Sequence, residues 1–382
     1  MGDFLALFYL VTAAVWLYRS KRAFDALREI PEIPIHSSAA ASSSFPKVSI
    51  LLPVKNEETN LKPCLQGLLR QDYPAKEIIV INDHSIDRTA EILSELVRSC
   101  PGQIKTMQAE TMPPGWTGKN WALAQGVKVA EGEWFLFTDA DTRHESWALA
   151  SAITHAEGRD LDLLTLTPRC LVEGFWEKLI QPAAMTFLGL WFPLNRVNDP
   201  TTNLTFGNGQ FLLIKKKAYE TMGGHAQVKD AFLEDYALVE TAKKKHLRIE
   251  CAFGSKIYGT RMYQSFLGIW LGWRRIYYHA FRKNPVRLFM KSLSVFVFSF
   301  LPFFFFPVFT QIALHNPEHF GKIWGAGFPI LAMILLTAWK AHDLVKAPRA
   351  YAFLHPVAGF ILTGILGDAF WTAVQKKELK WR

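Results

Sequence analysis

Residues 47 to 58 of the chain read Lys47-Val-Ser-Ile-Leu-Leu-Pro-Val-Lys-Asn-Glu-Glu58. Val48 to Leu52 is a continuous apolar run of strand length, and charged and amide side chains follow it directly. Two later runs have the same form, Ile78 to Ile81 and Trp134 to Phe137, and each of them also ends on polar residues. Short, unbroken apolar runs are typical of strands that are buried on both faces of a sheet.

Helix-like segments alternate with these strands. We expect helices at residues 60–70, 89–98 and 119–130, and a fourth strand at residues 161–166. Strands that alternate with helices predict an α/β fold with a mainly parallel sheet. In such sheets, ligands bind beyond the carboxyl ends of the strands. We therefore expect one site to contain the polar residues that follow the first three strands, which include Lys55, Asn56, Glu57, Asp83, Asp139 and Asp141.

The sequence also limits how this site would hold a phosphate. No GxGxxG follows the first strand and no GxxxxGK[ST] is present, so the glycine-rich loop of a dinucleotide enzyme or a P-loop NTPase is not expected. A metal held by carboxylates is the alternative. Asp139 and Asp141 stand two residues apart where a strand runs into a loop, and such oxygen ligands suit Mg²⁺ or Mn²⁺. The competing interpretation is an ordinary pair of aspartates in a turn.

Two further acids, Glu234 and Asp235, stand far along the chain at the start of a predicted helix at residues 235–244. An acid at that position is either a helix N-cap or a general base that removes the proton from an acceptor hydroxyl. The sequence leaves both interpretations open.

Apolar residues beyond the usual share lie at the beginning of the chain and in its last hundred or so positions. Phe4 to Tyr18 carries no charge, and we expect a membrane anchor at residues 1–20, uncleaved and with its N-terminus outside. Three later stretches are candidate spans: Ser292 to Pro317, Ile323 to Trp339 and Ala350 to Val374. A membrane region of two to three spans is therefore expected at residues 288–375.

The formal net charge is +9. The basic residues cluster beside the apolar segments, at Arg19, Lys21, Arg22, Arg274, Arg275, Arg282, Lys283, Arg287 and Lys291. This placement follows the positive-inside rule, so we expect a membrane partner and no nucleic acid. It also predicts a multi-pass protein of the cell membrane with its catalytic domain in the cytoplasm. The four cysteines have no zinc-site spacing, which favours reduced, structural thiols.

The remaining boundaries follow from composition. Residues 36–46 are rich in Ser and Ala and are expected to form a linker. The catalytic domain is expected at residues 47–260. Residues 261–287 combine aromatic and basic side chains, which predicts an amphipathic segment on the membrane surface.

Several phrases of the chain occur together, and in the same order, in one known family. They are the stretch 47–58, Val80-Ile-Asn-Asp83 with Ser85-x-Asp87-x-Thr89, Gly118-Lys-Asn120 with Ala122 and Gly126, Asp139-x-Asp141, Gly207-Asn-Gly-Gln210 with Gly223-Gly224, and Glu234-Asp235. On these motifs the chain resembles glycosyltransferase family 2, the inverting enzymes of the GT-A fold. The resemblance covers roughly residues 47 to 280.

Two phrases resemble one branch of the family most. Gly115-Trp-Thr-Gly-Lys-Asn120 and Arg261-Met-Tyr-Gln264, followed by Gly272-Trp273, are similar to hopene-associated and carotenoid (diaponeurosporenoate-type) glycosyltransferases, a branch that also includes ceramide glucosyltransferases. The resemblance implies transfer of a hexose from a nucleotide-sugar, expected to be a UDP-sugar, to a hydrophobic lipid acceptor. The rival interpretations are a processive polysaccharide synthase and a membrane scaffold that has lost its activity.

The resemblance also implies roles for individual residues on the donor side. Pro53, Val54 and Glu57 would line the nucleotide pocket. Asp83 would contact the base or ribose, and Lys119 would lie near the nucleotide or its phosphates.

For the metal and the acceptor, the family pattern implies that Asp139 contacts the ribose or the metal and that Asp141 binds the metal. Asp235 would be the base, with Glu234 beside it. The residues implied to form the acceptor site are Gly207, Asn208, Gly209, Gln210 and Trp273. The chain departs from the family in one respect, because the motif Q-x-x-R-W is missing around Trp273. This absence disfavours the processive synthase and leaves the contact of this segment with the diphosphate in doubt, where Arg261 or Arg274 would have to substitute.

Overall fold

The computed structural model describes residues 2–36, 45–314, 317–377 and 379. The chain forms two compact units. One unit, which we call the sheet unit, comprises Glu29–Arg169 and Leu194–Arg261. The other, which we call the helical unit, comprises Met1–Arg28, Cys170–Pro193 and Met262–Lys380. Most of the linker predicted at residues 36–46 lies outside the described residues.

The sheet unit is built on a seven-stranded sheet with the strand order β3-β2-β1-β4-β8-β6-β9. Strand β8 runs antiparallel to both of its neighbours, and the other pairs are parallel. The predicted α/β fold with a mainly parallel sheet is therefore confirmed. The strands of this sheet are β1 (Val48–Val54), β2 (Lys76–Asn82), β3 (Ile104–Gln108), β4 (Trp134–Phe137), β6 (Leu163–Thr167), β8 (Leu212–Lys215) and β9 (Ile249–Phe253).

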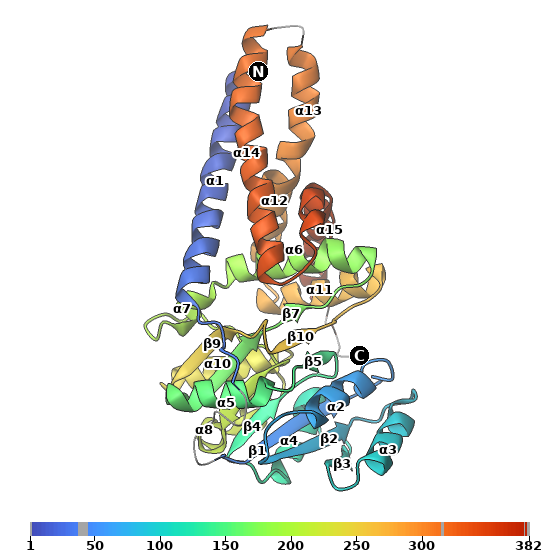
Figure 1. Cartoon of the computed structure of the whole chain (residues 1–382). Helices are drawn as coiled ribbons and strands as arrows, with labels where there is room; N and C mark the ends of the chain where they lie inside the picture. Colours follow the sequence, from blue (N-terminus) through green and yellow to red (C-terminus); the bar gives the residue numbers. More distant parts are fainter. Residues whose placement is uncertain (1, 37–44, 315–316, 378, 380–382) are drawn as a thin grey trace. The chain divides into compact units, whose positions relative to one another are not determined.

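Helices cover both faces of this sheet (Figure 1). Side chains along the strands alternate between the two faces: Ile50 and Leu52 belong to one buried cluster together with Leu65 of α2, and Leu51 belongs to a second one with Leu123 of α4. Burial on both sides explains why the strands are unbroken apolar runs. The helices of the sheet unit are α2 (Leu61–Leu69), α3 (Thr89–Ser99), α4 (Gly118–Lys128), α5 (Ala148–Gly158), α7 (Leu194–Asn198), α8 (Lys216–Met222), α9 (Gly224–Gln227) and α10 (Glu234–Lys244).

A second, smaller sheet has the strand order β5-β10-β7. Its strands are β5 (Thr142–His144), β10 (Tyr258–Thr260) and β7 (Arg169–Cys170). β5 and β10 are antiparallel, with Thr260 opposite Thr142. This pairing brings residue 260 next to the loop that follows β4, although the two segments are far apart in the sequence.

The division into units differs from the expected catalytic stretch 47–260 in one respect. Cys170–Pro193 leaves the sheet unit and joins the helical unit. Most of this segment is α6 (Phe175–Trp191), whose buried face includes Leu179, Ile180 and Phe187 and packs in the core of the helical unit. Its apolar residues therefore stabilise the helical unit, although they lie between two strands of the sheet unit in the sequence.

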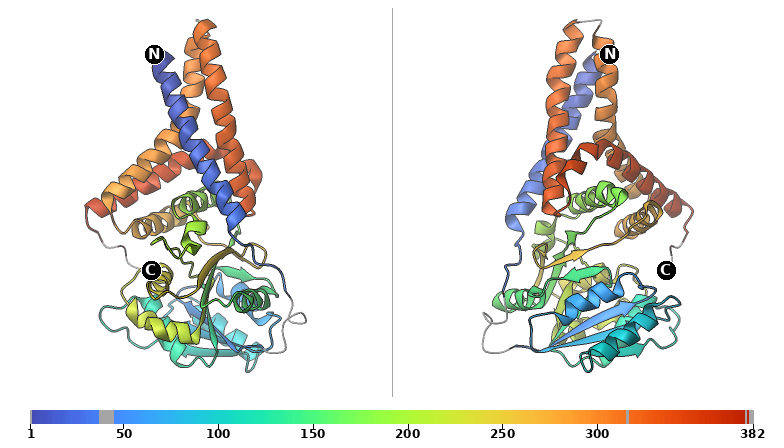
Figure 2. Two further views of the ribbon diagram at one scale, coloured as in Figure 1. Left: turned by 90° about the vertical axis from the view of Figure 1, so that its left-hand side faces the viewer. Right: turned by 45° about the vertical axis from the view of Figure 1, so that its right-hand side comes forward.

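The helical unit consists almost entirely of helices. They are α1 (Gly2–Glu29), α6, α11 (Phe266–Ala280), α12 (Pro285–Val295), the π-helix η2 (Phe296–Phe300), α13 (Leu301–Ala313), α14 (Pro317–Leu344), the 3₁₀-helix η3 (Arg349–Leu354) and α15 (His355–Val374). The helices α1, α13 and α14 run side by side in all three views (Figures 1 and 2). Tyr9 and Trp16 of α1 pack there against Ile330 and Ile334 of α14.

Two helical stretches of the described residues are long and apolar enough to cross a membrane, namely Pro285–Gln311 and Arg349–Val374. This finding concerns length and composition. The predicted anchor in α1 and the predicted span at residues 323–339 are not among them. Asp368, the acid inside the last stretch, accepts hydrogen bonds from Trp270 Nε1 (2.8 Å) and from Arg274 Nη1 (3.2 Å) of α11.

Candidate active site

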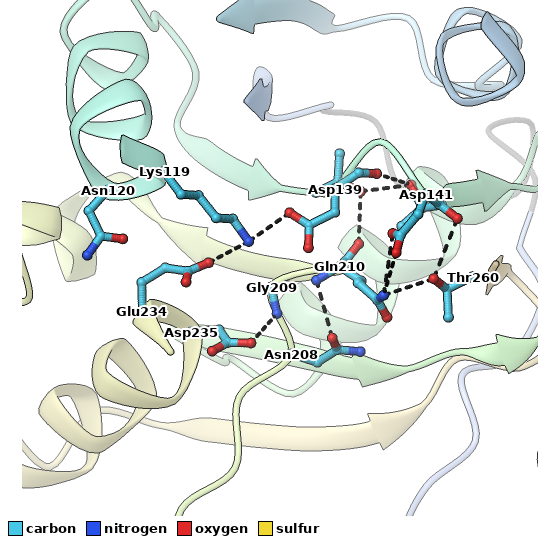
Figure 3. Close-up of polar contacts among 12 residues, drawn as sticks. Lys119, Asn120, Asp139, Asp141, Asn208, Gly209, Gln210, Glu234, Asp235 and Thr260 are labelled. Atoms are coloured by element: carbon cyan, nitrogen blue, oxygen red, sulfur yellow. Dashed lines mark hydrogen bonds and ion pairs between the residues drawn. The ribbon is translucent and has the colours of Figure 1, made fainter. Parts of the chain in front are cut away.

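Two loops and the starts of two helices meet at the carboxyl edge of the main sheet (Figure 3). Asp139 and Asp141 follow β4, the loop 207–210 precedes β8, and Glu234 and Asp235 begin α10. Lys119 reaches the same place from the first turn of α4. Residues that we predicted separately for the donor, the metal and the acceptor therefore lie together at this edge of the sheet.

Lys119 links the loop that follows β4 to the acidic pair of α10. Its Nζ lies 2.7 Å from Asp139 Oδ1 and 2.6 Å from Glu234 Oε1. Burial alone would lower the pKa of this buried lysine, but the charges of Asp139, Glu234 and Asp235 outweigh burial and raise it well above its ordinary value. Lys119 is therefore a permanent cation that holds two carboxylates in place.

Asp141 has no cation in direct contact among the described residues. Its two oxygens lie 3.4 Å and 3.3 Å from Gln210 Nε2, whose stronger hydrogen bond goes to Thr260 Oγ1 at 2.8 Å. Burial, followed by the like charges of Asp139 and Glu57, raises the pKa of Asp141 to about 7. A cation close to Asp141 would relieve this repulsion.

The residues present fit a divalent metal that also binds the substrate. Among the described residues, no group of three or more His, Cys, Asp or Glu side chains is arranged to hold a metal by itself. Mg²⁺ and Mn²⁺ are commonly held by one or two carboxylates together with substrate phosphates, however, and Asp141 with Asp139 supplies that number of carboxylates. The excess negative charge at Asp141 is the observation that favours a cation there.

Asp235 is positioned by two backbone N–H groups. Gly209 N donates to its Oδ2 at 2.7 Å, and Tyr236 N donates to its Oδ1 at 2.7 Å. Burial raises the pKa of Asp235 above its ordinary value, against the opposing effects of Lys119 and of these two donors. The residue before α10 that serves as N-cap is Leu233, so the N-cap interpretation of Asp235 is wrong. Asp235 lies in the first turn and is only partly buried.

Glu234 has a different environment from its neighbour. It is 5% exposed, and its contact with Lys119 occupies one carboxylate oxygen. Burial is the largest influence on its pKa, which is raised to about 7. Of the two acids, Asp235 is the less buried residue.

The other residues that we predict to contact the donor lie at or just after the ends of β1 and β2. Asp83 N donates to Val54 O at 2.8 Å, and Lys55 Nζ lies 3.0 Å from Asp83 Oδ2. A Cβ on Gly118 would stand 2.6 Å from the same Oδ2, so the start of α4 approaches Asp83 closely. Pro53 and Val54 are the last two residues of β1. Burial, together with the charges of Asp139 and Asp87, raises the pKa of Glu57.

Much of the sheet unit is similar to a known protein family. Residues 49–223 match the family model described as "Glycosyl transferase family 2". The chain is similar to family 2 glycosyl transferases over this stretch, and we call the sheet unit that contains it the transferase domain. Lys119, Asp139, Asp141 and the loop 207–210 lie within the matched residues, and Glu234 and Asp235 follow them in the chain.

Named relatives agree with this assignment. A β-monoglucosyldiacylglycerol synthase from Nostoc sp. is 29% identical over 224 residues, which are 58% of this chain and 46% of that protein. A 4,4'-diaponeurosporenoate glycosyltransferase from Staphylococcus aureus is 28% identical over 232 residues, which are 60% of each chain. The chain thus matches about half of the length of these relatives.

A solved structure supports the fold. The mannosyltransferase PcManGT from Pyrobaculum calidifontis, in complex with GDP-Man and Mn²⁺, is similar over 98% of this chain and 100% of that chain, with a TM-score of 0.56 and 17% identity. At this identity the similarity establishes the GT-A fold of the transferase domain.

The transferase domain contains a positioning residue that the sequence analysis quoted without a role. Asn120 is fully buried, and its Nδ2 donates to the carbonyl oxygens of Val228 (2.8 Å), Ala231 (3.0 Å) and Lys229 (3.2 Å). This fastens α4 to the segment that leads into Glu234 and Asp235. The signal that would have found it is its place directly after Lys119.

Asn208 and Trp273, both assigned to the acceptor, make structural contacts in the transferase. Asn208 Nδ2 donates to Leu166 O at 2.8 Å and so anchors the loop 207–210 to β6. Trp273 belongs to the helical unit, is 1% exposed, and donates its indole N–H to Gln181 Oε1 at 2.7 Å. The acceptor contacts of these two side chains stay predictions.

The glycines of the loop 207–210 allow a close approach to α10, which leads to a test. A Cβ on Gly207 would lie 2.3 Å from Asp235 O and 2.9 Å from Tyr236 N. Gly207→Ala should therefore displace Asp235 and lower the transfer rate by about 10²-fold, since a misplacement of about 1 Å has effects of that size. Gly158→Ala is the matched control, because nothing lies within 4 Å of its Cβ. Transfer rates and melting temperatures of both variants check the prediction, which fails if Gly207→Ala retains the rate of Gly158→Ala.

Proposed function

We propose that the chain transfers a hexose from a nucleoside-diphosphate sugar, most simply a UDP-sugar, to a hydroxyl or carboxyl group of a hydrophobic lipid, with inversion at the anomeric carbon. The observation that carries the proposal is the placement of a carboxylate, Asp235, which two backbone N–H groups hold in the same cluster as the pair Asp139 and Asp141. The named relatives act, by their names, on a diacylglycerol lipid and on a carotenoid acid, which favours a lipid acceptor here.

In the proposed mechanism, Asp235 accepts the proton of the acceptor hydroxyl as the acceptor oxygen bonds to the anomeric carbon. The bond between that carbon and the diphosphate oxygen breaks in the same step, and the nucleoside diphosphate leaves with the electron pair. The N–H groups of Gly209 and Tyr236 hold the base in position. Lys119 keeps the donor side and α10 in register through its two short contacts.

Asp141, with Asp139, would hold Mg²⁺ or Mn²⁺. When bound, such an ion offsets the charge that builds up on the departing diphosphate. Pro53, Val54, Glu57 and Asp83 would contact the nucleotide, and Gly207 to Gln210 would form the wall of the acceptor sugar site.

The proposal also includes a place in the cell. The two apolar helical stretches would anchor the chain in the cell membrane, with the basic residues beside them and the transferase domain on the cytoplasmic side. The amphipathic segment at residues 261–287 would lie at the surface of that membrane. A lipid acceptor would then be available without leaving its bilayer.

Transfer to lipid is tested with the full chain in a neutral detergent. UDP-glucose and GDP-mannose, each radiolabelled in the sugar, are offered with diacylglycerol or with a long-chain polyene carboxylic acid, in the presence of Mn²⁺. We expect label from one donor to enter the organic phase, and the product from an α-linked donor to be β-linked by NMR. Label that appears only as free sugar, or as a water-soluble polymer, would contradict the proposal.

A further inference from the structure

The helical unit contains a buried guanidinium without a carboxylate partner. Arg19 of α1 is 8% exposed. It forms no ion pair with a carboxylate among the described residues. Its hydrogen bonds go to neutral groups: Nη2 to Ser294 Oγ at 2.9 Å and to Ser294 O at 3.5 Å, and Nη1 to Ser299 Oγ at 3.5 Å. A guanidinium has five N–H donors. Of the three hydrogen bonds of Arg19, only the one to Ser294 Oγ is short.

Aromatic rings surround the same guanidinium. Its carbon Cζ lies 5.0 Å from the ring centroid of Trp16 and 5.6 Å from that of Phe187. Cation–π contacts offset part of the desolvation of a buried cation, but they do not neutralise its charge. A buried charge is normally paired, so the net charge at Arg19 is an unexplained feature of this unit.

A second polar group without a partner lies at the same rings. His355 is 6% exposed, and its Nε2 has no hydrogen-bond partner among the described residues. Its ring centroid is 5.5 Å from that of Trp16 and 6.2 Å from that of Phe187. Arg19 and His355 therefore share two aromatic neighbours, and both have unused hydrogen-bonding capacity.

Two more cations border this site on its more open side. Arg22 and Lys291 are both partly exposed, and no ion pair of either is found in the described part of the chain. Lys291 lies 5.4 Å from the Trp191 ring, and the like charges of Arg19 and Arg22 act on its ammonium group. Three cations held close together without an acid repel one another, and an anion between them would remove that repulsion.

The local backbone is also unusual here. Ser299 and Phe298 belong to the π-helix η2, and Phe298 O accepts a 2.6 Å hydrogen bond from Trp16 Nε1. Single π-helical turns occur frequently at functional sites. The widened turn presents Ser299 to Arg19 and frees a carbonyl group that fixes Trp16.

We propose that Arg19, with His355 and the flanking cations Arg22 and Lys291, binds a phosphate group. A guanidinium fork matches phosphate oxygens in pairs, and a cluster of cations at the cytoplasmic end of membrane segments attracts anionic lipids. The phosphate comes either from the headgroup of an anionic phospholipid or from a soluble source. Only the lipid source rests on the proposed membrane association.

The test uses the full chain, purified in a neutral detergent and without a sugar donor, so that it does not depend on transfer activity. Native mass spectrometry measures retention of phosphatidylglycerol against phosphatidylcholine with the same acyl chains. We expect the natural chain to prefer phosphatidylglycerol by about tenfold or more, the size of one charge-assisted contact. Arg19→Gln should lose this preference. Arg28→Gln is the matched control, because Arg28 is exposed on the same helix and stacks on the Phe24 ring.

A second arm separates the sources of the phosphate. If inorganic phosphate raises the melting temperature of the natural chain but not of Arg19→Gln, and no lipid preference is seen, the site binds a soluble phosphate. Should Arg19→Gln fail to fold, Arg19→Lys and His355→Phe are measured, and both should weaken binding. Equal retention of phosphatidylglycerol by the natural chain and by the folded Arg19 and His355 variants, with no effect of inorganic phosphate, would overturn the proposal.

Discussion

Asp141→Asn should reduce sugar transfer by on the order of 10³-fold or more, because it removes the carboxylate that would hold the metal. A bound metal contributes several kcal/mol to the stabilisation of a developing charge, and each 1.36 kcal/mol corresponds to a factor of about ten in rate. The asparagine side chain has almost the same volume, so the packing against Gln210 and Thr260 is retained. Rates of transfer with saturating Mn²⁺ measure the effect, with Glu220→Gln on the exposed face of α8 as the control that changes an acid to an amide.

Melting temperatures distinguish a lost metal site from a lost fold in this variant. The pKa of Asp141 is raised to about 7 from an ordinary value near 3.9. Its ionisation therefore costs stability as the pH rises through about 7, and the asparagine variant avoids this cost. In metal-free buffer at pH 8, Asp141→Asn should melt at the same temperature as the natural chain or higher. Mn²⁺ should raise the melting temperature of the natural chain alone. An equal Mn²⁺ response in both proteins would remove Asp141 from the metal site.

Asp235→Asn should lower the transfer rate by on the order of 10² to 10⁴-fold, with the KM for the donor largely unchanged, as expected for loss of a general base. The carboxylate uses one oxygen for Gly209 N and the other for Tyr236 N. Asparagine has a single side-chain oxygen, so one of these N–H groups loses its acceptor at a cost of about 1–3 kcal/mol in stability. The variant should therefore remain folded, with a lower melting temperature.

A nucleophile that needs no base separates the catalytic role of Asp235 from a structural one. Azide is already anionic, so it can displace the nucleoside diphosphate without giving up a proton. With Asp235→Ala, azide should restore turnover and yield a glycosyl azide, and it should not do so for Gly207→Ala, where the geometry of the loop is disturbed. Glu234→Gln is measured in parallel. Near-normal transfer by Asp235→Asn, with loss of transfer in Glu234→Gln, would make Glu234 the base.

The fold of the transferase domain was largely predictable, because its elements have local signals. The strands β1, β2 and β4 and the helix α10 lie within two residues of their predicted bounds. Each central strand is an apolar run with both faces buried, and burial of this kind leaves a mark in the sequence. The edge strand β3, with several exposed side chains, has no such signal and was not predicted. The antiparallel β8 was not predicted either, although Leu212 to Ile214 is a short buried apolar run.

The sequence allowed us to predict which residues meet at the site, because polar residues at strand ends gather at one edge of a parallel sheet. The sequence did not indicate which partners these residues would have. Lys119 was predicted to lie near the nucleotide or its phosphates, and the structure adds its contacts with Asp139 and Glu234. Trp273 was predicted to lie at the acceptor site, and the structure adds its burial and its hydrogen bond to Gln181.

By itself, the sequence determined the α/β class, the direction of most strands, the acidic residues of the site and the resemblance to glycosyltransferase family 2. Each of these depends on residues that are close in the chain or on motifs that keep their order. Only the tertiary structure decided that residues 170–193 join the helical unit, that Gly209 and Tyr236 hold Asp235, and that Arg19 is buried without an acid. These features depend on contacts between segments up to about 280 residues apart, and such contacts are selected by the packing of the whole unit, which no local pattern records.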